Sequence, residues 1–92
     1  MNKRLELEKI LQISGDTDVV FFDGLDAAIV GLGTQQYKGP YVIYDREKCL
    51  EILMARDGMT HEEAEEFFSF NTDGCWAGEK TPIVLMTIDG RE

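Results

Sequence analysis

The sequence has few of the residues that build metal centres and disulfide frameworks. Its 92 residues include two cysteines, Cys49 and Cys75, and a single histidine, His61. Two cysteines do not make a disulfide framework, and one histidine beside them cannot complete the four-ligand set of a structural zinc site. The sequence therefore predicts no structural zinc, no disulfide framework and no cofactor.

Basic residues are also scarce. The chain has 9 Lys plus Arg against 18 Asp plus Glu, which gives a formal net charge of -9. Such a field repels phosphate backbones, so we expect no direct nucleic-acid binding, whereas docking on a basic protein surface is favoured. No charged-then-apolar leader opens the sequence, and no apolar run approaches about 18 residues, so we expect no membrane span and a cytoplasmic location.

The composition is that of a globular protein. Hydrophobic residues make up 43 % of the chain and aromatic residues 10 %. A chain of this length buries enough surface for one modest core, so we expect a single compact domain over residues 1–92. The oligomeric state, a homo-oligomer included, is left open.

Residues 41–76 carry the clearest structural signals, which predict a strand, a helix, a turn and a second helix. Asp45 is placed to cap the first helix, and Gly58 is placed to end it in the left-handed conformation. Thr60 and Glu63 have the spacing of a capping box for the second helix. The predicted inward faces are Cys49, Leu50, Ile52 and Leu53 in the first helix, and Ala64, Phe67 and Phe68 in the second.

The remaining pattern predicts one more helix and three more strands, which with 41–44 makes four strands. The expected ranges are 3–14 for the helix, 19–22, 27–32, 41–44 and 83–88 for the strands, and 34–40 for a polar loop. Gly31 and Gly33 weaken the second strand and mark a bulge or a close backbone approach. Strand 83–88 shows little alternation, which predicts cover on both faces. The short connections between 19–22, 27–32 and 41–44 favour an antiparallel meander of these three strands. The predicted fold is α+β: a small, largely antiparallel sheet of three to four strands with two or three helices packed on one face.

Four aspartates flank the predicted strand 19–22, namely Asp16, Asp18, Asp23 and Asp26. Converging carboxylates would suit Mg²⁺ or Ca²⁺, because hard cations prefer several oxygen ligands. The EF-hand spacing is missing, however, and aspartates serve loops and turns equally well. The sequence favours the solvated loop and leaves a metal at the Asp16–Asp26 cluster open.

No motif predicts catalysis. The helix–turn–helix outline of residues 46–70 would present Glu62, Glu63, Glu65 and Glu66 to DNA, so we exclude major-groove binding. Gly31-Leu32-Gly33 is too short for a dinucleotide loop. Gly74-Cys75-Trp76 has the local pattern of a papain-type nucleophile, but the long downstream part of that family does not fit within 92 residues.

Three stretches span most of residues 21–82: FFDGLDAAIVGLG, YVIYDREKCLEILMARDGMTHEEAEEFF and FNTDGCWAGEKTP. In this order they resemble a small uncharacterised protein family of tailed bacteriophages and prophage-bearing bacteria. The resemblance implies a phage or bacterial origin and action in the cytoplasm of a bacterium or infected host cell. It brings no established activity, so no catalytic role is carried over.

The leading functional hypothesis is a non-enzymatic protein that binds and modulates a host or phage protein with a basic surface. Its predicted contact residues are Glu62, Glu65 and Glu66, because like charges packed so closely on one helix cost stability and exceed what solubility needs. The alternative is a small-molecule or nucleotide binder that uses residues 23–39, with Asp23, Asp26, Tyr44 and Trp76 as its candidate site. A metal-dependent enzyme built on the aspartates is the third hypothesis.

Overall fold

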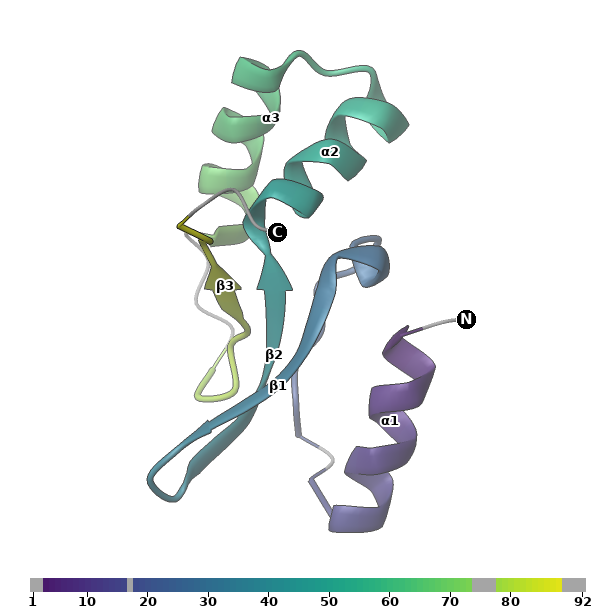
Figure 1. Ribbon diagram of the computed structural model, residues 1–92, viewed down its shortest axis with the longest axis vertical. Coiled ribbons are helices and arrows are strands. Elements are labelled where there is room, and N and C mark those ends of the chain that lie inside the picture. Colours follow the sequence, from purple (N-terminus) through teal and green to yellow (C-terminus); the bar gives the residue numbers. More distant parts are fainter. Residues whose placement is uncertain (1–2, 17, 74–77, 89–92) are drawn as a thin grey trace.

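The computed structural model describes residues 3–16, 18–73 and 78–88, and these form an α+β fold (Figure 1). Within them, three helices accompany a three-stranded mixed sheet that is mostly antiparallel. The elements are α1 (Lys3–Ser14), the 3-10 turn η1 (Asp26–Ala28), β1 (Ile29–Gln35), β2 (Lys38–Asp45), α2 (Arg46–Asp57), α3 (His61–Phe68), the π-helical turn η2 (Ser69–Asp73) and β3 (Ile83–Leu85). The predicted fold class is confirmed.

The sheet has the order β1-β2-β3. β1 and β2 form the expected antiparallel hairpin, whereas β3 lies parallel to β2, with Ile43 opposite Ile83. The meander was predicted for strands 19–22, 27–32 and 41–44 only, and the orientation of the last strand was not predicted. The chain passes through α2 and α3 before it returns to the sheet, and a connection of that length allows a parallel strand.

The β1–β2 hairpin is longer than predicted, because the expected loop 34–40 is mostly strand. The ladder continues to the pair Gln35 and Lys38, and only Gln36 and Tyr37 make the turn. Both turn residues have positive φ, 27° and 67°, a conformation that hairpins usually give to Asn-Gly. A Gln-Tyr pair is not typical of such turns, so the sequence did not predict a turn at these two residues.

Glycines in β1 behave as predicted. The register shifts between Ile29 and Gly31 and again between Gly33 and Gln35, which confirms the irregular pairing expected there. A Cβ atom at Gly33 would lie 2.7 Å from Ile43 Cδ1, so the side chain from β2 occupies the space that glycine leaves open.

Residues 19–22 do not form the predicted strand. The Phe22 N–H donates to the Tyr44 hydroxyl rather than to a neighbouring strand, and Val19, Phe21 and Phe22 pack against the core instead. These apolar side chains are partly buried, and the Phe22 N–H pairs with a side chain instead of a strand. The next predicted strand also starts late, because its first residues form η1.

The helix signals are confirmed at the level of individual atoms. Asp45 Oδ1 accepts from the Glu47 N–H at 3.0 Å and from the Lys48 N–H at 3.5 Å, and Gly58 ends α2 with φ 69°. Thr60 Oγ1 accepts from the Glu63 N–H at 3.2 Å, while Glu63 Oε1 accepts from the Thr60 N–H at 2.9 Å. Helix 3–14 has the predicted bounds.

The core lies where the sheet meets α2 and α3. Its fully buried side chains are Val42, Tyr44, Cys49, Leu50, Leu53, Ala64 and Phe68. Phe67 is 38 % exposed, so its predicted inward orientation is wrong, whereas the same prediction is confirmed for Ala64 and Phe68. β3 is shorter than predicted, and Ile83 and Leu85 are exposed, so the prediction that both faces are covered is also wrong. Cys75, Trp76 and the polar tail 89–92 lie outside the described residues.

Candidate functional site

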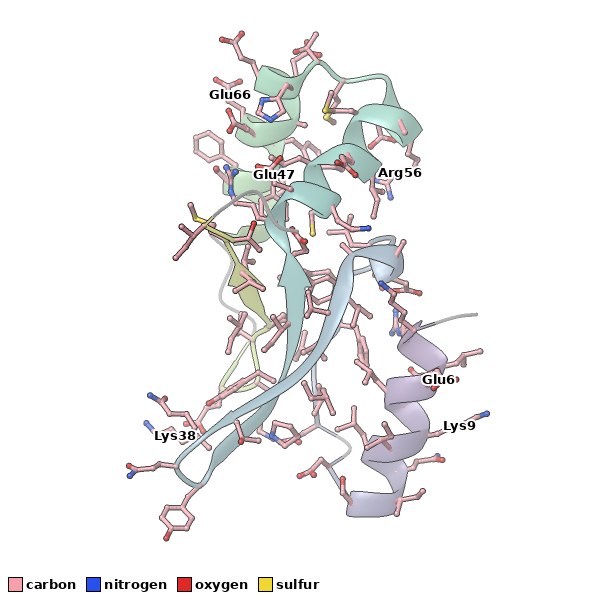
Figure 2. The ribbon with its side chains drawn as sticks, in the orientation of Figure 1. Glu6, Lys9, Lys38, Glu47, Arg56 and Glu66 are labelled. Carbon is pink, nitrogen blue, oxygen red and sulfur yellow. The ribbon has the colours of Figure 1, made fainter. Side chains whose placement is uncertain are left out.

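The glutamates of α3 lie on different sides of the helix. Because Ala64 and Phe68 face the core and successive residues turn by about 100°, Glu62 and Glu66 point away from it. Both are exposed, and Figure 2 shows Glu66 projecting outward at the end of the molecule formed by α2 and α3. Neither makes an ion pair within the described ranges.

Glu65 lies on the flank of α3 that faces α2. Its carboxylate is 3.6 Å from Arg46 Nη2, and 3.9 Å separates it from His61 Nδ1. An arginine from a neighbouring element therefore neutralises the charge of Glu65 in part. Of the three predicted contact residues, the structure leaves Glu62 and Glu66 facing solvent together and turns Glu65 toward α2.

A shallow apolar groove follows the opposite flank of α3. It has a volume of about 430 Å³ and is lined by Met59, Glu63, Glu66, Phe67, Phe70 and Asn71. Phe67 is 38 % exposed and Phe70 is 79 % exposed, so two aromatic rings border the hollow beside the Glu66 carboxylate. The groove combines exposed aromatic rings with a polar rim, and exposed apolar surface rimmed by polar residues marks protein contact sites.

Phe70 lies just beyond the end of α3, in η2. η2 winds as a π-helical turn, and the Asn71 side-chain amide donates to the Phe67 carbonyl at 3.1 Å. Phe70 falls outside the core series of Ala64 and Phe68 even on a regular helix. The helical position of Phe70, away from the buried residues, could therefore have predicted its exposure. Neither Phe70 nor Met59 was predicted from the sequence as a contact residue.

Of the alternative candidate residues, the structure describes Asp23, Asp26 and Tyr44, and Tyr44 does not reach the surface. Tyr44 is fully buried, and its hydroxyl accepts from the Phe22 N–H at 2.8 Å. Burial raises the pKa of Tyr44 to about 12, so this phenol is neutral at pH 7. A side chain without exposed surface cannot contact a ligand that arrives from solvent unless the core opens. Trp76 lies outside the described residues.

Asp23 and Asp26 are brought together by Arg4 of α1. Arg4 Nη1 lies 3.7 Å from Asp23 Oδ1 and 3.9 Å from Asp26 Oδ1, and the guanidinium sits 4.6 Å from the centre of the Phe21 ring. The arrangement ties α1 to the segment before β1. Arg4 was not singled out by the sequence, because its partners are about twenty positions away.

The four aspartates do not converge. Asp16 accepts from the Ser14 hydroxyl at 2.8 Å, Asp18 pairs with Lys80 at 3.2 Å, and the other two face Arg4. In the part of the chain that the structure describes, no three His, Cys, Asp or Glu side chains are arranged to hold a metal ion.

A second hollow lies beside β1, between α1 and the start of α2. Its volume is about 480 Å³, and its walls are Lys3, Glu6, Leu7, Ala28, Ile29, Val30, Gly31, Asp45 and Lys48. Lys3 Nζ is already engaged there, since it donates to the Ile29 carbonyl at 3.1 Å and to the Ala27 carbonyl at 3.3 Å. This hollow overlaps the predicted ligand region, residues 23–39, through Ala28, Ile29, Val30 and Gly31.

Comparison of the chain with protein-family models, with curated proteins and with solved structures found no match. The resemblance to phage proteins stays a prediction. Among the described residues, the longest helices have 12 residues, and none has the length and apolar character needed to cross a bilayer.

Proposed function

We propose that this protein is a non-enzymatic binding protein that contacts a basic surface of a host or phage protein through the outer side of α3. The contact face consists of Glu62 and Glu66 together with the groove between Met59 and Phe70. The observation that carries the proposal is the position of the exposed rings of Phe67 and Phe70 beside the Glu66 carboxylate.

Each part of this face has a separate physical role. Apolar rings supply binding free energy when a partner removes them from water, at roughly 25 cal/mol per Å² of apolar surface. Carboxylates at the rim act mainly on the association rate, because they attract a basic patch before contact. Glu65 adds less to this attraction, since Arg46 already lies 3.6 Å from its carboxylate.

The test begins with capture of partners from host lysate and continues with binding kinetics of the purified pair. A Glu62→Gln, Glu66→Gln variant removes the two outward charges, while glutamine preserves the helix. We expect the association rate to fall and its dependence on salt to weaken, because exposed charges are screened beyond roughly 10 Å at 0.1 M salt.

Glu65→Gln is the matched control, since it removes one carboxylate from the same helix on the flank toward α2. It should leave the association rate close to that of the parent. The proposal fails if the double variant and the parent associate at the same rate and with the same salt dependence. It fails equally if Glu65→Gln slows association as much as the double variant does.

The hollow beside β1 favours a second candidate function, the binding of a small molecule. Its lining includes buried Ala28 and Ile29 together with Val30, which is 56 % exposed. A thermal-shift screen with nucleotides and host metabolites would test this function. A stabilising compound should lose its effect in Val30→Glu, which places a charge at the mouth, and should keep it in Glu66→Gln.

A further inference from the structure

The groove on α3 has a definite length and direction. It begins near Met59, just before the helix, passes Glu63 and Phe67, and ends at Phe70 and Asn71. From position 63 to position 70 a helix advances roughly 10 Å at about 1.5 Å per residue. The lining residues from Glu63 to Phe70 therefore span about two helical turns along α3 and the start of η2.

A partner helix matches this length. On such a helix, apolar side chains at positions i, i+4 and i+7 repeat over the same roughly 10 Å and form a ridge that packs into a groove. An added strand does not suit this face. Strand addition needs a row of unpaired backbone groups at a sheet edge, and within α3 these groups bond one another along the helix.

The charges beside the groove restrict the partner further. Glu66 forms part of the groove wall, and Glu62 lies one turn earlier on the outward side. Glu63 is held by the capping box, with its Oε1 accepting from the Thr60 N–H at 2.9 Å. A partner helix in the groove therefore meets two outward carboxylates and one that is locked in place, so cations should flank its apolar ridge.

We infer that the α3 groove binds a cationic amphipathic helix of a partner protein, with apolar side chains seated between Met59 and Phe70 and Lys or Arg side chains beside Glu62 and Glu66. This inference rests on the proposed function and assigns the structural class of its partner. It also predicts that the spacing of the partner's residues matters, and not only their composition.

The test uses two synthetic peptides of about 14 residues built from leucine and lysine. One places leucine at i, i+3, i+4 and i+7 so that a helix has one apolar face, and the other has the same composition with the leucines dispersed. Fluorescence anisotropy of each labelled peptide with the full chain gives its affinity. We expect the patterned peptide to bind about tenfold or more tightly than the dispersed one.

Variants of the groove make the test specific. Phe70→Ser should weaken binding of the patterned peptide about tenfold, since it removes a ring that is 79 % exposed in the unbound protein. Glu66→Gln should weaken binding and reduce its salt dependence, whereas Glu65→Gln should change neither. Circular dichroism and an unfolding curve of each variant confirm that it is folded. If Phe70→Ser does not fold, Glu66→Gln still tests the groove.

The outcomes separate this inference from the proposed function. Equal affinity for the two peptides overturns the helical partner and leaves an acidic binding face in place. A second outcome is that neither peptide binds, but a captured protein associates more slowly with the Glu62→Gln, Glu66→Gln variant than with the parent. This outcome overturns only the inference that the partner is a helix. If neither peptides nor captured proteins respond to these substitutions, both the inference and the proposed function are wrong.

Discussion

The backbone N–H of Phe22 donates a hydrogen bond of 2.8 Å to the hydroxyl of Tyr44, and the two rings lie 4.8 Å apart at an angle of 37°. Tyr44 of β2 thus accepts a hydrogen bond from the backbone of Phe22, which is not paired with a described strand, and its ring also packs against the Phe22 ring. A buried hydroxyl normally keeps a hydrogen-bond partner, and here that partner ties residues 18–25 to the sheet.

Tyr44→Phe should lower the free energy of unfolding by about 1 to 3 kcal/mol, because the Phe22 N–H loses its acceptor while the ring still fills the core. Urea unfolding of variant and parent measures the difference. Tyr37→Phe is the matched control, since Tyr37 is fully exposed at the hairpin turn and should change stability very little. Equal losses in both variants would contradict the structural role of this hydroxyl.

The same residue predicts a dependence of stability on pH. Desolvation raises the pKa of folded Tyr44 from 10.0 to about 12, so between these values the folded chain retains a proton that the unfolded chain has lost. Its contribution is fully present below pH 10 and is lost as pH rises toward 12, by at most about 1.4 kcal/mol per pH unit. The midpoints of thermal unfolding of the parent and of Tyr44→Phe should converge as pH rises through this window. Parallel curves would show that Tyr44 ionises alike in both states.

The capping box should contribute measurably to the stability of α3. Thr60→Ala removes the acceptor of the Glu63 N–H and should lower the free energy of unfolding by about 0.5 to 2 kcal/mol. Thr60→Ser keeps the hydroxyl and should retain most of that stability. Chemical denaturation measures all three proteins. The cap contributes nothing if the alanine variant unfolds at the same midpoint and with the same slope as the parent.

Adjacent phenylalanines should respond very differently to truncation. Phe68 has 0 % exposure whereas Phe67 has 38 %, so Phe68→Ala should cost about 3 to 5 kcal/mol and Phe67→Ala distinctly less. Such a loss is a large part of the roughly 5 to 10 kcal/mol that a small domain holds. Unfolding curves of the two variants measure the difference. The reverse order of losses would mean that α3 turns its other side to the core.

The hairpin turn should gain stability when its residues suit its backbone. Gln36 and Tyr37 have φ values of 27° and 67°, and a Gln36→Asn, Tyr37→Gly variant supplies the pair that such turns prefer. We expect the free energy of unfolding to rise by a few tenths to about 1 kcal/mol. The midpoint of urea unfolding measures the gain, and Gln36→Gly, Tyr37→Pro should lower it, because proline excludes positive φ. A loss in the first variant would show that the Tyr37 side chain has a stabilising role.

Local signals predicted the helices well. The bounds of α1, the Asp45 and Thr60 caps and the Gly58 stop all depend on residues within a few positions of one another. The sequence likewise placed the α3 glutamates in the candidate contact face. It could not separate Glu65 from Glu66, because that distinction depends on Arg46, nineteen residues before Glu65.

The sequence by itself determined the charge of -9, the α+β class and the helix ends. These follow from composition, from the order of helical and strand patterns, and from hydrogen bonds within one helical turn. Only the tertiary structure decided the parallel placement of β3, the pairing of Phe22 with Tyr44 and the groove that joins Phe70 to Glu66. The first two are contacts between residues that lie far apart in the chain. The groove depends on which flank of α3 the core covers, and packing against α2 and the sheet settles that choice between two similar apolar faces.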